Sequence, residues 1–285
     1  MPHCTLSTFL GDVFMNYCKT LTIAGSDSSG GAGIQADIKT MSALGCYSTT
    51  VITAITAQNT LGIYAIEKIS YKIIAKQLEA VLDDIRPDAI KIGMVNDTKS
   101  IEVIADILQG VSDIPIVIDP VMVSTTGSQL MEESAIKIFR KKLIPLSILL
   151  TPNIPEVEVL INRKITNIKD VLSVANRLID LNCKAVLVKG GHLDGKEKVD
   201  YLLRKQYPII PYTSPMVKTS NNHGTGCTLS SAITSFIARG EDIEQAIQKA
   251  KEYITQSLIA GANIKIGQGH GAVNHFYNPQ KLIKR

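Results

Sequence analysis

The sequence predicts an α/β fold, in which a central, mainly parallel sheet is flanked by helices on both faces and has a small antiparallel pair at one edge. Short apolar runs rich in β-branched residues alternate with longer segments of helical period, which indicates successive β-α-β crossovers. Most of these runs are apolar throughout, as is typical of strands covered on both faces. With 285 residues and 45% hydrophobic content, the chain can bury a large core.

The elements follow in chain order. The predicted strands are residues 20–24, 49–57, 89–92, 116–118, 148–150 and 184–188, with the antiparallel pair at 198–203 and 206–211. The predicted helices are residues 34–44, 71–85, 99–108, 132–142, 168–181, 228–238 and 243–260. Gly45, Pro87 and Gly240 supply the stop signals expected just beyond helix ends.

The chain shows no internal repeat, low-complexity segment or linker, so we expect one domain over residues 19–285. Residues 1–18 form an N-terminal extension, which we expect to be disordered or not translated. Its first 14 residues lack a basic n-region and contain Asp12, so they make a poor signal peptide.

Charge and cysteine usage exclude several classes of protein. The net charge of +4 comes from scattered basic residues, which does not favour nucleic-acid binding. The five cysteines are widely spaced and form no CxxC pair, so neither a disulfide framework nor a zinc site is expected. A reducing, cytoplasmic location fits this usage best. No apolar run is long enough to span a bilayer, and no membrane association is expected.

A glycine-rich loop, within TIAGSDSSGGAGIQAD (Thr22 to Asp37), follows the first predicted strand. It matches G-x-G-x-x-A at residues 31–36, but the next strand, VITAITAQNT, lacks the acidic residue that a dinucleotide site needs. A P-loop fails as well, because Gly31 stands where lysine is required. We favour a small-molecule cradle over a plain flexible turn, because open α/β sheets bind ligands at this end of a strand.

A second motif, NNHGTGCTLSSAI (Asn221 to Ile233), leads into a predicted helix. Unpaired amides at a helix N-terminus bind anions, and Gly224 and Gly226 let the backbone approach one closely. Thr225 could cap the helix or add a hydroxyl donor. The same field is expected to lower the pKa of the Cys227 thiol. An anion site beside a proton acceptor suits phosphoryl transfer onto an alcohol, although a small buried cysteine is the alternative.

Eight segments together carry a family resemblance. They are GSDSSGGAGIQADIKT, VITAITAQNT, KIGM, DPVM, TPNIPEVEVL, VKGGH, HGTGCTLSSAI and GHGAVNHF, in this order. The sequence resembles the hydroxymethylpyrimidine/phosphomethylpyrimidine kinases of thiamine biosynthesis, within the ribokinase-like superfamily. The resemblance covers about residues 19–276.

The resemblance implies a ribokinase-like fold and an activity. Members use ATP and a divalent metal, Mg²⁺, to phosphorylate 4-amino-5-hydroxymethyl-2-methylpyrimidine and then its monophosphate. Where many superfamily members carry an aspartate base, this family has a cysteine, here Cys227. Superfamily relatives are often dimers, so a homodimer is expected.

The resemblance also implies roles for individual residues. The catalytic anion-binding turn falls on Gly224, Thr225, Gly226 and Cys227. Pyrimidine contacts fall on Gly25, Asp37, Gln58, Met94 and Val121, ATP contacts on Asn153, Lys189 and Thr225, and metal contacts on Asp119 and Glu156.

Three alternatives stay open at this point. Some relatives with the same cysteine motif phosphorylate pyridoxal or pyridoxine, which are also flat heteroaromatic alcohols. A thiol hydrolase or transferase would use Cys227 as a covalent nucleophile, with His223, His270 or His275 as the base. A non-catalytic sensor would bind the pyrimidine without consuming ATP.

Overall fold

The computed structural model describes residues 15–122, 130–190 and 197–284. Over these residues, nine strands form one sheet in the order β3-β2-β1-β4-β5-β6-β7-β8-β9. The strands are β1 Lys19–Asp27, β2 Tyr47–Asn59, β3 Gly62–Lys68, β4 Ala89–Ile92, β5 Ile116–Ile118, β6 Leu149–Leu150, β7 Ala185–Lys189, β8 Glu197–Arg204 and β9 Ile210–Pro215. Neighbours from β2 to β7 run parallel, whereas β3, β8 and β9 pair antiparallel at the two edges. The predicted mainly parallel sheet is therefore confirmed.

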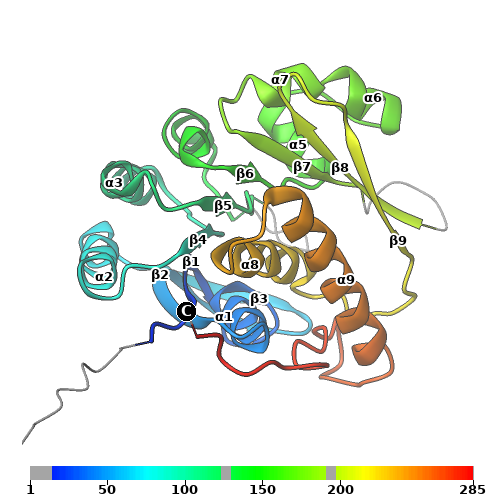
Figure 1. The fold of residues 1–285 in the computed structure, drawn as a ribbon, viewed down its shortest axis with the longest axis horizontal. Helices are drawn as coiled ribbons and strands as arrows, with labels where there is room; N and C mark the ends of the chain where they lie inside the picture. Colours follow the sequence, from blue (N-terminus) through cyan, green and yellow to red (C-terminus); the bar gives the residue numbers. More distant parts are fainter. Residues whose placement is uncertain (1–14, 123–129, 191–196, 285) are drawn as a thin grey trace, which may run out of the picture.

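Helices cover both faces of the sheet (Figure 1). They are α1 Gly33–Ala43, α2 Tyr71–Asp84, α3 Thr98–Leu108, α4 Glu133–Ile138, α5 Ile154–Ile161, α6 Ile168–Ser173, α7 Ala175–Ile179, α8 Thr225–Ala238 and α9 Ile243–Gly261. Side chains of α2 to α7 pack with β1, β4 and β5 in the larger core cluster. Helices α8 and α9 bury their apolar faces against the opposite side, and α1 packs beside α8 there. This layering explains why the central strands are mainly apolar and buried.

Two strand predictions need correction. Strand β3 was not predicted, because as an edge strand it exposes much of its length and has a weak apolar pattern. The final strand was predicted at residues 206–211 but runs over Ile210–Pro215. Residues 205–209 instead turn the chain after β8, and Gln206 has a positive φ of 63° there.

Three helix predictions differ as well. The predicted helix at 132–142 is α4 followed by a π-helical segment, Phe139–Leu143. The predicted helix at 168–181 is divided into α6 and α7 at Val174, whose φ of −106° and ψ of 3° leave the helical region. Helix α5 was not predicted, although Asn153 and Glu156 form a capping box at its start.

The described part of the N-terminal extension contacts the other end of the chain. Tyr17 forms a β-bridge with Lys284, and the Cys18 N–H donates to the Ile283 carbonyl. The Cys18 side chain is fully buried. Residues 1–14 lie outside the described residues. The division into an N-terminal extension (residues 1–18) and one domain (residues 19–285) therefore remains a prediction.

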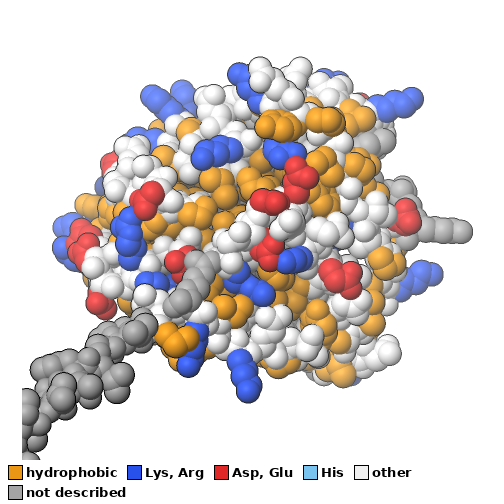
Figure 2. Space-filling model, viewed as in Figure 1, with side chains coloured by type: hydrophobic (Ala, Val, Ile, Leu, Met, Phe, Trp, Pro, Cys, Tyr) orange, Lys and Arg blue, Asp and Glu red, His pale blue; other side chains and the backbone are white. Residues whose placement is uncertain are grey.

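The molecular surface shows no strong segregation of charge on the face drawn in Figure 2, where basic and acidic side chains lie interspersed. Apolar side chains lie between them over much of this face. In the part of the chain that the structure describes, no helix combines the length and apolar character that a membrane span requires.

The topology fixes where a ligand can bind. The chain passes from β1 to β2 on one side, and β4 then pairs with β1 on the other side. The strand order therefore reverses between β1 and β4, and ligands in open α/β sheets bind at the carboxyl ends of the strands at such a point.

Candidate active site

A cavity of about 710 Å³ opens at the carboxyl ends of the parallel strands. Its wall includes residues at or just after the carboxyl ends of β1, β4, β5, β6 and β7, together with the N-terminus of α8. The predicted site residues in this wall are Gly25, Gln58, Met94, Asp119, Val121, Asn153, Glu156, Lys189, Gly224, Thr225, Gly226 and Cys227. Segments more than 200 residues apart in the sequence, from Gly25 to Cys227, thus meet around one space.

The anion-binding turn forms the N-terminus of α8. Gly224 is the N-cap and has φ 77° and ψ 10°, a left-handed conformation that favours glycine. A Cβ at Gly224 would lie 1.8 Å from the carbonyl oxygen of Gly31, so the two glycine-rich loops touch here. The amides of the first helical turn have no partner within the helix. The Thr225 N–H donates to the Asn222 carbonyl at 3.3 Å, and the amides that follow it are available to an anion in the cavity.

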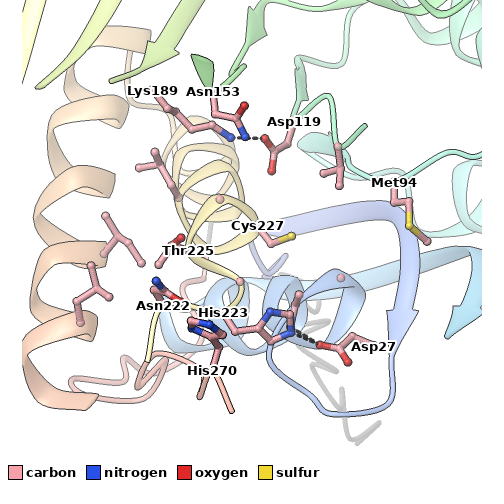
Figure 3. A pocket seen from close by; sticks show the side chains of 18 of the residues that line it. Asp27, Met94, Asp119, Asn153, Lys189, Asn222, His223, Thr225, Cys227 and His270 are labelled. Carbon is pink, nitrogen blue, oxygen red and sulfur yellow. Dashed lines mark hydrogen bonds and ion pairs between the residues drawn. The ribbon is translucent and has the colours of Figure 1, made fainter. Parts of the chain in front are cut away.

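Cys227 lies in the first turn of α8 and is partly exposed to the cavity. In Figure 3 it sits between the Lys189–Asp119 pair and the His223–Asp27 pair. Burial raises the pKa of its thiol to about 11, although the Lys91 ammonium and the Gly33 N–H lower it. The expected lowering of this pKa is therefore wrong, because desolvation of the thiolate outweighs the field of the helix.

The ammonium of Lys189, at the end of β7, forms ion pairs with both predicted metal ligands. Its Nζ lies 2.7 Å from Oδ1 of Asp119 and 3.9 Å from Oε2 of Glu156. Burial would lower the pKa of this ammonium, but the two carboxylates raise it above its usual value. The lysine is therefore a fixed positive charge opposite the start of α8. A Cβ at Gly226 would lie only 3.3 Å from its Nζ.

Glu156 is held by the capping box of α5. Its Oε2 accepts the N–H of Asn153 at 2.7 Å, and the Asn153 side chain accepts the N–H of Glu156 at 2.9 Å. Asn153 also forms a parallel β-bridge with Lys189, which ties the start of α5 to the end of β7. The capping box thus fixes a carboxylate and an amide at the cavity wall.

We predict that Glu156→Gln stabilises the protein at neutral pH more than at acidic pH. Burial raises the pKa of Glu156 to about 7, against the Lys189 charge, which lowers it. The folded-state pKa is higher than the value of about 4.3 in an unfolded chain, so ionisation costs the folded state stability as the pH rises from about 4 to about 7. Thermal unfolding should be measured at about pH 5 and about pH 8. The melting temperature of the variant relative to that of the wild type should be higher at about pH 8 than at about pH 5. The same difference in melting temperature between the two proteins at both pH values would contradict the ionisation of Glu156 in this range.

Among the residues at the cavity, Asp27 and Lys91 had no role assigned from the sequence, and His223 was named only as a candidate base of the thiol enzyme. Nε2 of His223 lies 2.8 Å from Oδ2 of Asp27 and 3.3 Å from Nε2 of Gln58. Asp27 also accepts backbone N–H groups of Ser29, Gly31 and Ala32, so it organises the glycine-rich loop. Burial would raise the pKa of Asp27, but hydrogen bonds from His223 and Ser29 hold it well below its usual value. An aspartate that ends a strand and precedes Ser-Ser-Gly-Gly is a signal that could have predicted this turn.

Asp37 is the one predicted contact that the structure does not place at the cavity. Its side chain is fully buried and accepts hydrogen bonds from Thr22, Lys91 and Ser231. The predicted pyrimidine contact at this position is therefore corrected: the carboxylate lies behind the cavity wall, where it neutralises Lys91. A lysine inside the apolar strand Ala89–Ile92 was the sequence signal, because such a charge requires a buried partner.

Comparisons with known proteins show the family to which this chain is similar. The sequence profile of the family "Phosphomethylpyrimidine kinase" matches residues 27–274. The chain is 43% identical over 258 residues to a hydroxymethylpyrimidine/phosphomethylpyrimidine kinase of Rhizobium meliloti, covering 90% of this chain and 96% of that protein. The structure resembles a phosphomethylpyrimidine kinase of Clostridium difficile, with a TM-score of 0.75, 49% identity and coverage of 84% and 99%. It also resembles a pyridoxal kinase of Bacillus subtilis in complex with ADP, with a TM-score of 0.83, 33% identity and coverage of 91% and 98%.

Proposed function

Because this chain belongs to the phosphomethylpyrimidine kinase family, we propose that it transfers the γ-phosphoryl group of ATP to 4-amino-5-hydroxymethyl-2-methylpyrimidine and then to its monophosphate, in thiamine biosynthesis. The observation that carries this proposal is the arrangement around the cavity. The N-terminus of α8 and the Lys189 ammonium face the same space, and Cys227 lies in the first turn of α8 beside it. This arrangement suits a transferring phosphoryl group beside an alcohol.

The pyrimidine binds at the β1/β2 side of the cavity. Gly25, Gln58, Met94 and Val121 line this side. A Cβ at Gly25 would lie 2.2 Å from Cε of Met94, so a larger residue at this position would displace the end of the methionine side chain. The Gln58 amide can both donate and accept, which suits the edge of an aminopyrimidine.

ATP binds at the opposite side, where Asn153, Lys189 and Thr225 line the cavity. In the reaction the hydroxyl oxygen bonds to the γ-phosphorus while the bond to the bridging oxygen of ADP breaks. The amides of residues 224–227 and the Lys189 ammonium stabilise the charge on the phosphoryl oxygens. The hydroxyl proton passes to the Cys227 thiolate, which becomes a thiol.

The residues around Lys189 also fit Mg²⁺. Asp119 and Glu156 supply carboxylates, and magnesium typically takes one or two of these in addition to substrate phosphate oxygens. Oδ1 of Asp119 bonds the lysine, whereas Oδ2 lies 3.4 Å from the Ser230 hydroxyl. We propose that these two carboxylates hold the metal, which neutralises phosphate charge when bound. Within the described residues, no cluster of three or more His, Cys, Asp or Glu side chains forms an all-protein metal cage.

The pH dependence of turnover tests the role of the thiolate. Because the pKa of Cys227 is about 11, the thiolate fraction grows with pH throughout the neutral range. We predict that kcat with saturating substrates rises about tenfold per pH unit at pH 7 to 9, provided that chemistry limits the rate. Steady-state assays across this range, with viscosity controls for product release, measure the slope. A flat kcat under chemistry-limited conditions would contradict proton transfer to the thiolate.

A pyridoxal kinase is the second candidate, supported by the likeness to the B. subtilis enzyme. ADP production should be measured with hydroxymethylpyrimidine and with pyridoxal under the same conditions. The proposal predicts a higher kcat/KM for the pyrimidine, and a higher value for pyridoxal would favour the second candidate. A covalent thiol enzyme is disfavoured, because the family to which the chain belongs consists of kinases.

We also propose that the protein is a cytoplasmic homodimer. Use of ATP and the spacing of the cysteines support the compartment. Exposed apolar side chains at the β2/β3 edge, Tyr47, Ile55 and Tyr64, support the assembly. Sedimentation of the native protein and of an Ile55→Lys variant tests it, and a wild-type monomer at micromolar concentration would contradict it.

A further inference from the structure

A lysine lies inside the parallel sheet, directly behind the reaction centre. Lys91 belongs to β4, and its side chain is fully buried, yet it contributes to the cavity wall. Its Nζ lies 2.9 and 3.1 Å from the two carboxylate oxygens of Asp37, which is fully buried as well. A buried ion pair of this kind is weak evidence for stability, because desolvation offsets the attraction. A role in the chemistry of the site would account for it.

The position of Asp37 relates this pair to Cys227. Oδ1 of Asp37 accepts the Ser231 hydroxyl at 2.7 Å, and Oδ2 accepts the Thr22 hydroxyl at 2.6 Å. Ser231 follows Cys227 by four residues in α8, so the two side chains project from the same face of the helix. The Lys91–Asp37 pair therefore lies under the face of α8 that carries the thiol.

Charged groups from four elements act on Cys227. Lys91 of β4 favours the thiolate, whereas Asp37 of α1 and Asp119 after β5 oppose it. Lys189 of β7 also interacts with the thiolate. The Gly33 N–H at the start of α1 favours the thiolate as a hydrogen-bond donor. Among the groups that lower the pKa of Cys227, Lys91 has the largest effect. Lys91 is not one of the residues proposed to bind phosphate or metal.

We infer that Lys91 is a positioning residue for Cys227, whose buried ammonium stabilises the thiolate that accepts the substrate proton, and that Asp37 keeps this ammonium charged and in place. This role rests on the proposed function, because it matters to turnover only if Cys227 takes the proton. Asp37 has two opposing effects in this arrangement. It holds the lysine, and its own charge opposes the thiolate.

The test is the rate at which iodoacetamide alkylates Cys227 at pH 8, with neither nucleotide nor substrate present. Mass spectrometry of the Cys227 peptide separates it from the other cysteines, and the rate follows the thiolate fraction. We expect Lys91→Met to slow alkylation about tenfold for each unit by which the pKa of Cys227 rises.

Lys91→Met leaves a buried carboxylate unpaired, which typically costs about 3–5 kcal/mol and can prevent folding. The double variant Lys91→Met/Asp37→Asn removes both charges and avoids this cost. Its alkylation rate should lie below that of the wild type, because the effect of Lys91 exceeds that of Asp37. Lys251→Met/Asp200→Asn is the matched control, since it removes another buried Lys–Asp pair, with a distance of 2.7 Å, and should leave the rate unchanged.

Equal alkylation rates in the wild type and the double variant would overturn the inference. Alkylation requires no ATP and no pyrimidine, so this outcome is independent of the proposed function. Conversely, a wild type that phosphorylates no alcohol would refute the proposed function and leave the alkylation result standing.

Discussion

Replacing Cys227 with alanine is expected to lower kcat about 10²- to 10⁴-fold, the range typical of losing a general base. The thiol lies in the first turn of α8, between the Lys189–Asp119 pair and the substrate side of the cavity. Because the amides of the turn remain in place, ATP should still bind, and its KM should change little. Steady-state kinetics with hydroxymethylpyrimidine as the alcohol measure the effect.

Two further variants separate proton transfer from packing. Cys227→Ser keeps nearly the same volume but lacks a group that ionises in the accessible range, so it should be as slow as the alanine variant. Cys183→Ala removes a buried cysteine that lies in the larger core cluster, outside the cavity wall, and should retain turnover. A kcat near that of the wild type for Cys227→Ala would remove the thiol from the mechanism.

Replacing Gly224 with alanine is expected to both destabilise the protein and abolish most turnover. The left-handed φ of 77° costs a residue with a Cβ about 1–2 kcal/mol. The added Cβ would also lie 1.8 Å from the Gly31 carbonyl oxygen, so one of the two loops must move. A displacement of about 1 Å at a reaction centre can cost about 10² in rate. Thermal unfolding and steady-state kinetics of the same preparation measure the two effects.

The matched control is Gly110→Ala. A Cβ at Gly110 meets no atom within 4 Å, and its φ is not in the left-handed region, so both stability and turnover should persist. If Gly224→Ala kept the turnover of the wild type, close packing of the two loops would not be needed for the reaction.

The central fold could be predicted because its strands are buried on both faces. Strands β1, β4 and β5 are mainly apolar and almost completely buried, which indicates a sheet covered on both faces. The edge strands β3 and β9 were predicted less accurately than the central strands. Strand β3 exposes most of its side chains, so its burial pattern carries little periodic signal. Strand β9 begins four residues later than predicted, because the chain first makes a turn after β8.

The two glycine-rich turns of the cavity wall could be predicted from the sequence pattern, whereas the other predicted wall residues came from the family resemblance. The roles of Asp27 and Asp37 depend on contacts that span the fold. Asp27 bonds His223, and Asp37 bonds Ser231, each almost 200 residues further along the chain. The pKa of Cys227 could not be inferred from its helix position alone, because burial has the opposite and larger effect.

The central claim is ATP-dependent phosphorylation of the pyrimidine alcohol. The most direct measurement is mass spectrometry of the products formed over time from ATP, magnesium and 4-amino-5-hydroxymethyl-2-methylpyrimidine. The structure and the family predict a monophosphate first and a diphosphate later, with one ADP released for each phosphate transferred. Absence of any phosphorylated pyrimidine, under conditions in which the protein is folded and pyridoxal or another alcohol is phosphorylated, would contradict the claim.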